Sequence, residues 1–147
     1  MTNAPITPRP RTSDTQLHDT YEHRNCAALK WNATAKRWQG NLHFRRGTLA
    51  VYLEVNPSFG YAGQPALRIR QVSDNDNIGC LFRNPDGTFY GRLDTEKPFP
   101  LFGMENKDAG RFVIKKRHGV HLVQNTRRPF VTLNLTPYPK GEQYHGK

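Results

Sequence analysis

The stretch that decides the fold is residues 37–55, which read RWQGNLHFRRGTLAVYLEV. In its first half, apolar residues or glycine occupy every even position from Trp38 to Phe44, and polar residues occupy the odd ones. In its second half, apolar residues occupy every odd position from Leu49 to Val55. Alternation with a period of two is typical of antiparallel strands that are buried on one face. These residues therefore predict a β-hairpin.

The same pattern extends over most of the chain. Turn residues separate the runs at Arg46-Gly47 and at Pro85-Asp86-Gly87, and Asn56-Pro57 opens a longer loop. No stretch has convincing helical periodicity, so we expect an all-β protein, a small antiparallel OB-like barrel or sandwich. Further strands are predicted at residues 26–31, 65–72, 78–83, 88–93, 99–104, 111–115, 120–124 and 130–136.

The pattern divides the 147 residues into three parts. Residues 1–25 are polar and rich in proline, which predicts a disordered arm. Residues 26–137 form the β-barrel domain, and residues 138–147 form a short tail. Within the domain, two hairpins resemble each other about 51 residues apart, which suggests repeats over 26–72 and 78–137. A duplicated β-unit and chance similarity between two hairpins both account for this.

Composition excludes several classes of protein. No run approaches the roughly 18 apolar residues of a membrane helix, so no membrane partner is expected. The first twenty residues contain no apolar core of a secretory signal. Cys26 and Cys80 are too few for a disulfide scaffold or a cysteine zinc site. We expect reduced core thiols in a cytoplasmic protein, with a single disulfide as the alternative.

Charge indicates the kind of partner. The net charge is +10, and it is concentrated in two blocks. Residues 26–72 carry seven Lys or Arg and one acid, and residues 111–147 carry eight and one, whereas the segment between them is acidic. Such basic surfaces usually bind a polyanion, most often nucleic acid. The alternative is that the charge packages a polyanion without recognising its sequence, or that it only forms a solvated surface.

The first basic block suggests a surface for single strands. Its outward strand positions carry cations and a tyrosine, and the loop after Asn56 carries two aromatic residues and no charge. Cations neutralise phosphates, and flat side chains stack on bases. The loop aromatics either stack on bases or fold back to cap a barrel end. The predicted binding residues here are Arg37, His43, Arg45, Arg46, Tyr52, Phe59, Tyr61, Arg68 and Arg70.

A second basic cluster surrounds a hairpin expected to turn at His118-Gly119. It either contacts phosphates or is a charged hairpin tip that discourages edge-to-edge aggregation. Trp31 and Trp38 lie in register with apolar neighbours, which favours a place in the core over a stacking role. The predicted binding residues in this cluster are Arg111, Lys115, Lys116, Arg117, Arg127 and Arg128.

The second half of the domain also carries a family resemblance. The residues Ile78-Gly79-Cys80-Leu81-Phe82-Arg83-Asn84, then Phe89-Tyr90-Gly91-Arg92-Leu93, and finally Val131-Thr132-Leu133-Asn134-Leu135 are similar to short plasmid- and phage-borne β-barrel proteins. Some of those families are OB-like single-stranded-DNA-binding proteins that act in replication. The resemblance implies such a barrel and such a ligand. The chain departs from the bacterial members because residues 144–147 form no acidic tip, so recruitment of partners through a tip is not expected.

Catalytic readings are weaker. Pro85-Asp86 and Glu105-Asn106-Lys107 fit the loose spacing of a Mg²⁺-dependent nuclease motif. That motif belongs to an α/β core, whereas Pro85-Asp86-Gly87 is also an ordinary turn. The sequence therefore predicts a non-catalytic protein without cofactor or metal, which binds nucleic acid, with single-stranded DNA favoured and RNA as the other candidate ligand, and which can self-associate. The alternatives are a structural or assembly protein that docks an acidic partner and, third, the nuclease.

Overall fold

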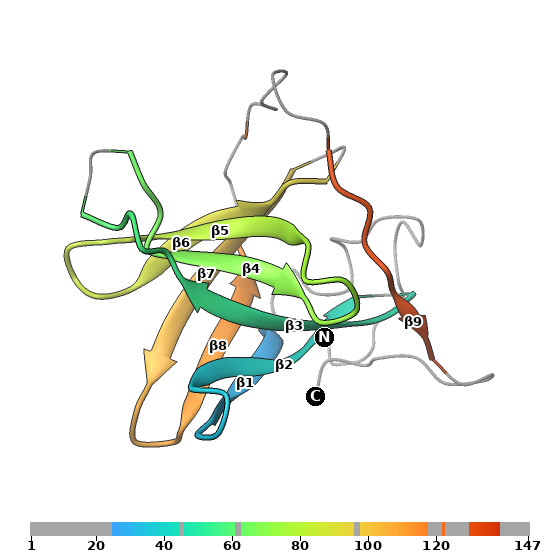
Figure 1. The fold of residues 1–147 in the computed structure, drawn as a ribbon, viewed down its shortest axis with the longest axis horizontal. Helices are drawn as coiled ribbons and strands as arrows, with labels where there is room; N and C mark the ends of the chain where they lie inside the picture. Colours follow the sequence, from blue (N-terminus) through green and yellow to red (C-terminus); the bar gives the residue numbers. More distant parts are fainter. Residues whose placement is uncertain are drawn as a thin grey trace, which may run out of the picture.

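The computed structural model describes residues 25–44, 46–60, 63–95, 98–117, 122 and 130–138; for residues 25 and 26 it describes the backbone alone. Within these ranges the chain is all-β and contains no helix (Figure 1). Strands β1 to β4 span Asn25–Asn32, Arg37–Phe44, Gly47–Val55 and Leu67–Gln71. Strands β5 to β9 span Asn77–Arg83, Phe89–Leu93, Phe99–Asn106, Arg111–Lys116 and Thr136–Pro137.

The first eight strands form a closed antiparallel barrel. Each pairs with its neighbours in sequence, and β8 pairs back with β1, where Leu29 lies opposite Phe112. The prediction of a small antiparallel barrel is confirmed. The strand order is up-and-down, so the likeness to OB folds lies in size and closure, since an OB fold proper follows a five-stranded Greek key. The two segments proposed as repeats each supply four consecutive strands of the barrel, and their common origin stays a prediction.

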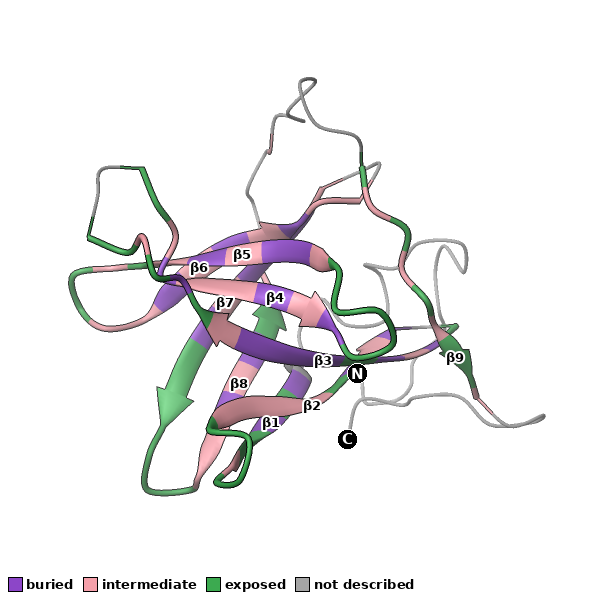
Figure 2. Cartoon of the chain, in the orientation of Figure 1, coloured by how far each residue is buried: buried purple, intermediate pink, exposed green. Residues whose placement is uncertain are grey.

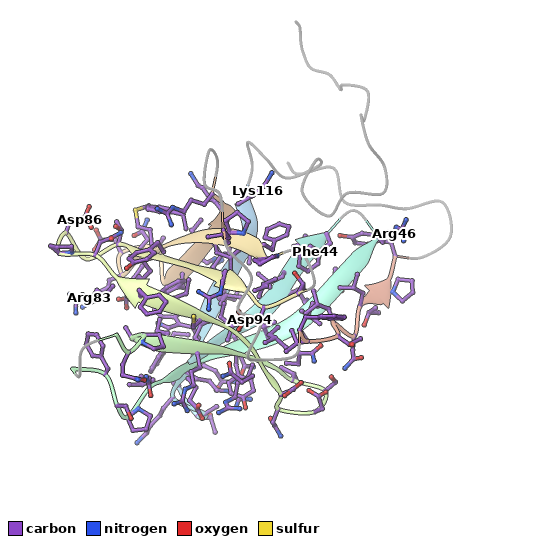
Figure 3. The ribbon with its side chains drawn as sticks, turned by 90° about the horizontal axis from the view of Figure 1, so that it is seen from above. Phe44, Arg46, Arg83, Asp86, Asp94 and Lys116 are labelled. Carbon is purple, nitrogen blue, oxygen red and sulfur yellow. The ribbon has the colours of Figure 1, made fainter. Side chains whose placement is uncertain are left out.

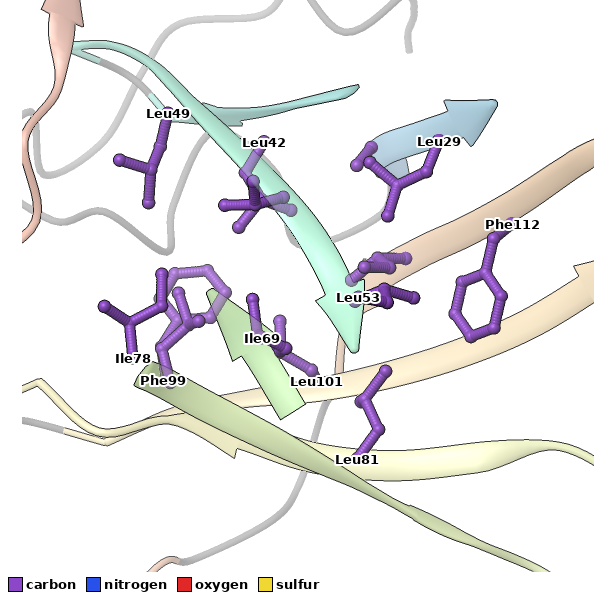
Figure 4. Packing of buried hydrophobic residues seen from close by; sticks show 14 of the residues in the cluster. Leu29, Leu42, Leu49, Leu53, Ile69, Ile78, Leu81, Phe99, Leu101 and Phe112 are labelled. Carbon is purple, nitrogen blue, oxygen red and sulfur yellow. The ribbon is translucent and has the colours of Figure 1, made fainter. Parts of the chain in front are cut away.

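Apolar side chains fill the barrel. The residues that alternate inward from all eight strands pack into one cluster, and the largest of them are fully buried (Figures 2 and 4). An eight-stranded barrel is just wide enough for side chains to fill its interior. Cys80, expected in the core, instead occupies an outward position on β5 and is partly buried. The largest fully buried side chains are Phe44, Phe99, Phe112, Leu29, Leu42, Leu49, Ile69, Ile78, Leu81, Leu93 and Leu101.

One end of the barrel is crossed by the chain itself. Residues 130–137, here called the strap, run past this end, and their last two residues pair with the start of β3 (Figure 1). Val131, Leu133 and Leu135 pack against the core, while the residues between them are exposed. A strand was predicted over 130–136, but only Thr136–Pro137 is one. The alternation is real because one side of the extended segment is partly buried against the core, yet its backbone forms no ladder over most of its length.

Gln71 holds the strap in place. This buried side chain of β4 donates from Nε2 to the carbonyl oxygen of Thr132 (3.2 Å) and accepts from the backbone N–H of Asn134 (2.8 Å) at Oε1. The N–H of Val131 donates to the carbonyl oxygen of Asp94 (2.8 Å). We call this the strapped end. The other end, with the 33–36, 56–66, 84–88 and 107–110 connections, is the open end.

Candidate nucleic-acid interface

An aromatic row crosses the outer surface of three neighbouring strands. On β5, β6 and β7 the inner positions are taken by residues such as Leu81 and Leu101, so the residues next to them face outward. Phe82 lies opposite Tyr90, and Tyr90 lies opposite Phe102. Directly opposite residues of an antiparallel pair share a face and lie close together. The three rings therefore follow one line across the sheet.

The rings of this row are partly exposed, and two of them are in contact. Phe82 and Tyr90 stack with their centroids 5.4 Å apart and their planes inclined by 22°. The guanidinium carbon of Arg117 lies 5.2 Å from the centroid of Tyr90. An arginine beside an aromatic ring offers both a flat surface and a positive charge.

Basic side chains continue the row. Lys115 is exposed and lies opposite Phe102, next in line on β8. Arg92, on β6, donates from Nε to the Asp94 carboxylate at 2.9 Å, so its charge is paired. Lys116, the last residue of β8, lies opposite the inward-facing Leu101 and is partly buried. Figure 3 labels it at the end of β8. The β5–β8 face, defined by Phe82, Tyr90, Phe102, Lys115 and Arg117, combines flat rings with two cations.

Several predicted residues of the first block lie elsewhere, on the outside of β2, β3 and β4. The Arg37 guanidinium carbon lies 3.8 Å from the centroid of the Tyr52 ring. Tyr52 itself is buried, and its hydroxyl donates to Oδ1 of Asn75 (3.0 Å). A base has no access to a ring that is covered in this way. Tyr52 therefore holds Arg37 and the 72–76 turn in place.

An acid shares this face with the two arginines of β4. The Arg70 Nε donates to Oε1 of Glu54 at 2.9 Å, and the Arg68 Nη1 lies 3.9 Å from the same oxygen. A second nitrogen of Arg70 donates to the carbonyl oxygen of Asn75 (2.9 Å). Part of the positive charge that the sequence places here is thereby neutralised, although both pairs are partly exposed and are worth little in stability.

The remaining predicted residues are spread over both ends. His43 is half-buried, with Nδ1 3.4 Å from the Tyr138 hydroxyl, and burial lowers the pKa of His43. Arg46 is exposed in the turn before β3 at the strapped end (Figure 3), and Arg111 begins β8 at the open end. Phe59 is 48% exposed, so it does not fold back as a cap. Arg45, Tyr61, Arg127 and Arg128 lie outside the described residues.

The two tryptophans form an edge-to-face pair, with centroids 5.4 Å apart. Trp38 packs against the core as expected, whereas Trp31 is 50% exposed, so the prediction that it is a core residue is wrong. Trp31 is in the inward register, but it lies beyond the last filled layer at the open end. Register fixes the direction of a side chain, and it does not fix how deep in the barrel the side chain lies.

The sequence reasoning missed the aromatic row. Phe82, Tyr90 and Phe102 occupy the outward positions of runs that were predicted as strands, and outward aromatics were sought only in the first basic block. The row also depends on register, because three rings in three separate runs become one line only after the strands are paired. The row could have been recognised from the fact that each of the three predicted strands carries an aromatic residue at an outward-facing position.

Asp86, the first carboxylate of the proposed nuclease motif, is engaged within its own turn. Asp86 accepts hydrogen bonds from the Thr88 hydroxyl (2.6 Å) and backbone N–H (2.9 Å), which lower the pKa of Asp86 and hold the turn closed. Glu105 lies near the end of β7. No group of three or more His, Cys, Asp or Glu able to hold a metal ion occurs among the described residues.

Comparison with known proteins returns no relative. No protein-family model, curated protein or solved structure matches the chain. Within the described ranges, no helix has the length and apolar character needed to cross a membrane.

Proposed function

We propose that this barrel binds single-stranded nucleic acid, preferentially DNA, on its β5–β8 face and without catalysis. The observation that supports this most is the line Phe82–Tyr90–Phe102, which ends at Lys115 and has Arg117 beside its central ring. Stacking of a base on an aromatic side chain contributes about 1–3 kcal/mol and tolerates any base. Cations beside the rings neutralise the phosphates between successive bases.

The net charge of +10 supports the same ligand class. A basic surface draws a polyanion from a distance, and it does so without reading its sequence. Duplex DNA hides its bases in the stack, so a row of flat side chains favours a strand whose bases are free. The β2–β4 face offers fewer free groups, since Tyr52 is buried and Glu54 pairs with both arginines.

The test is a titration of labelled single-stranded DNA, duplex DNA and single-stranded RNA of equal length, followed by fluorescence anisotropy at several salt concentrations. We expect the tightest binding to single-stranded DNA, with affinity falling steeply as salt rises. Tyr90→Ala should weaken binding about tenfold, which is the loss of one stacked base. Circular dichroism would verify that this partly buried position tolerates alanine.

A substitution at an exposed charged residue tests the same face without removing a buried side chain. Lys115→Gln removes an exposed cation of the β5–β8 face, and it should lower both the affinity and the slope of log K against log salt by about one phosphate contact. Lys36→Gln is the matched control, because Lys36 is also exposed but lies in the β1–β2 turn. Equal effects of the two variants, or equal affinity for single strands and duplex, would contradict the proposal.

A further inference from the structure

The open end of the barrel contains a cavity of about 520 Å³. It reaches the surface where β2 and β3 stop pairing: their ladder ends at Gln39 and Tyr52, and Trp38 and Leu53 beyond it both line the cavity. A volume of 300–1,000 Å³ is usual for small-molecule sites, and the mouths of β-barrels are one of their preferred places. This cavity is separate from the β5–β8 face.

Four aromatic side chains form a continuous wall of the cavity. Trp31 contacts Trp38, Trp38 lies 5.9 Å from Phe112, and Phe112 lies 5.3 Å from Phe89, in each case between ring centroids. Gly103 makes this wall possible, because a Cβ at that position would come within 2.9 Å of the Phe112 ring. The glycine thus leaves room for the Phe112 ring beside β7.

The angles between the rings indicate the shape of the ligand. The planes of successive pairs are inclined by 69°, 54° and 44°, so the wall offers no parallel pair between which a flat ring could be sandwiched. Phe82 and Tyr90 on the outer face, inclined by only 22°, show the contrasting arrangement. Inclined rings around one cavity fit a compact, rounded group better than a flat one.

A carboxylate lies beside the aromatic wall. Glu105 lines the cavity opposite the inward-facing Phe112, and it is exposed. The cavity is also lined by Glu54, which pairs with Arg70, and by two cations. Arg37 stacks on Tyr52 and keeps its charge, and Lys36 lies in the exposed β1–β2 turn. Because the faces of aromatic rings are negative, the rings together with Glu105 favour a cation whose charge is spread over methyl groups.

We propose that the open end is a binding site for a small organic cation, a quaternary or methylated ammonium group held by Trp31, Trp38 and Phe112 and balanced by Glu105. The carboxylate attracts the cation, and the rings replace the water around its methyl groups. Aromatic cages recognise quaternary ammonium ligands in this way. The site does not depend on nucleic-acid binding, and either proposal can fail alone.

Intrinsic fluorescence provides the test, because both tryptophans of the chain line the cavity. The full chain is titrated with choline, with its neutral tert-butyl isostere, in which carbon replaces the quaternary nitrogen, and with the anion of tert-butylacetic acid. Sodium chloride keeps the ionic strength constant. We expect choline to change the tryptophan emission saturably and to bind about tenfold more tightly than the neutral isostere, with the anion weaker still.

Two variants locate the binding. Trp31→Ala removes a half-exposed ring and should abolish the change in emission on adding choline, although Trp38 remains as a fluorophore in the cavity. Glu105→Gln should weaken choline several-fold and leave the isostere unchanged. Asp108→Asn is its matched control, since Asp108 is exposed nearby in the 107–110 turn and does not line the cavity. Equal affinity for choline and the isostere, no response to choline, or equal effects of the two acid variants would overturn the proposal.

Discussion

The two ends of the barrel start from the same sequence pattern and finish differently. At the strapped end, Phe44 packs edge-to-face on Phe99, and three apolar residues of the strap lie against the core. At the open end, Trp31 and Val55 occupy the same inward register, but they are 50% and 71% exposed. Alternation therefore decides which face of a strand turns inward, whereas a distant segment decides whether the end of that face is covered.

The largest effect should come from the buried aromatic pair at the strapped end. Phe99→Ala removes a fully buried ring, and it should lower the free energy of unfolding by about 3–5 kcal/mol. Trp31→Ala, at the open end, should cost only about 1 kcal/mol, roughly the worth of one aromatic pair. Urea denaturation of both variants measures the difference. Equal losses would mean that the two ends are equally well packed.

The strap should depend on one side chain. Gln71→Leu keeps the approximate volume but leaves the N–H of Asn134 and the carbonyl of Thr132 without their partner, at a cost of about 1–3 kcal/mol. Hydrogen exchange at the Asn134 amide should become faster by a larger factor than exchange within β7. Gln64→Leu, in the exposed loop at the open end, is the control: it removes only a 3.4 Å acceptor of Asn56 Nδ2, so it should lower the free energy of unfolding less than Gln71→Leu and should not single out the Asn134 amide for faster exchange. Unchanged protection at Asn134 would show that the apolar contacts alone hold the strap.

The smallest effect is a pH dependence at the strapped end. Burial lowers the pKa of His43 below its ordinary value of 6.5, so the unfolded chain takes up a proton that the folded chain does not. The free energy of unfolding should therefore fall as the pH drops through 6.5, until the folded pKa is passed. His43→Gln should flatten this fall in urea titrations made on either side of that pH. An identical pH profile in the variant would contradict the prediction.

The sequence predicted eight strands of the barrel within a few residues of their observed ends, because turn residues and alternation are local properties. It mispredicted residues 130–136, where alternation reflects one-sided burial against the barrel end and not a ladder. It also placed Tyr52 outward, which is correct. The burial of the Tyr52 side chain was not predicted, because its contacts with Arg37 and Asn75 form only when the fold brings these residues together.

The candidate sites were less accessible to sequence reasoning than the strands. The basic residues 115–117 were found because they are contiguous, whereas the aromatic row and the cavity each combine residues from several strands. Such sets are fixed by register and closure. The aromatic row requires the register of β5, β6 and β7, which are neighbours along the chain. The cavity also requires the register between β1 and β8, the paired barrel strands that are farthest apart in the sequence.

That last pairing sets the order in which the molecule can assemble. Every other hydrogen-bonded pairing between barrel strands joins neighbours along the chain, so these hairpins can form as soon as their residues are available. Leu29 meets Phe112 only after the intervening sequence has been made, and the loop closed at that step is the longest in the barrel. Until then β1 and β8 are unpaired edges, open to other chains. Variants at the β1–β8 pairing should therefore slow folding, and increase aggregation during synthesis, more than variants in the hairpins.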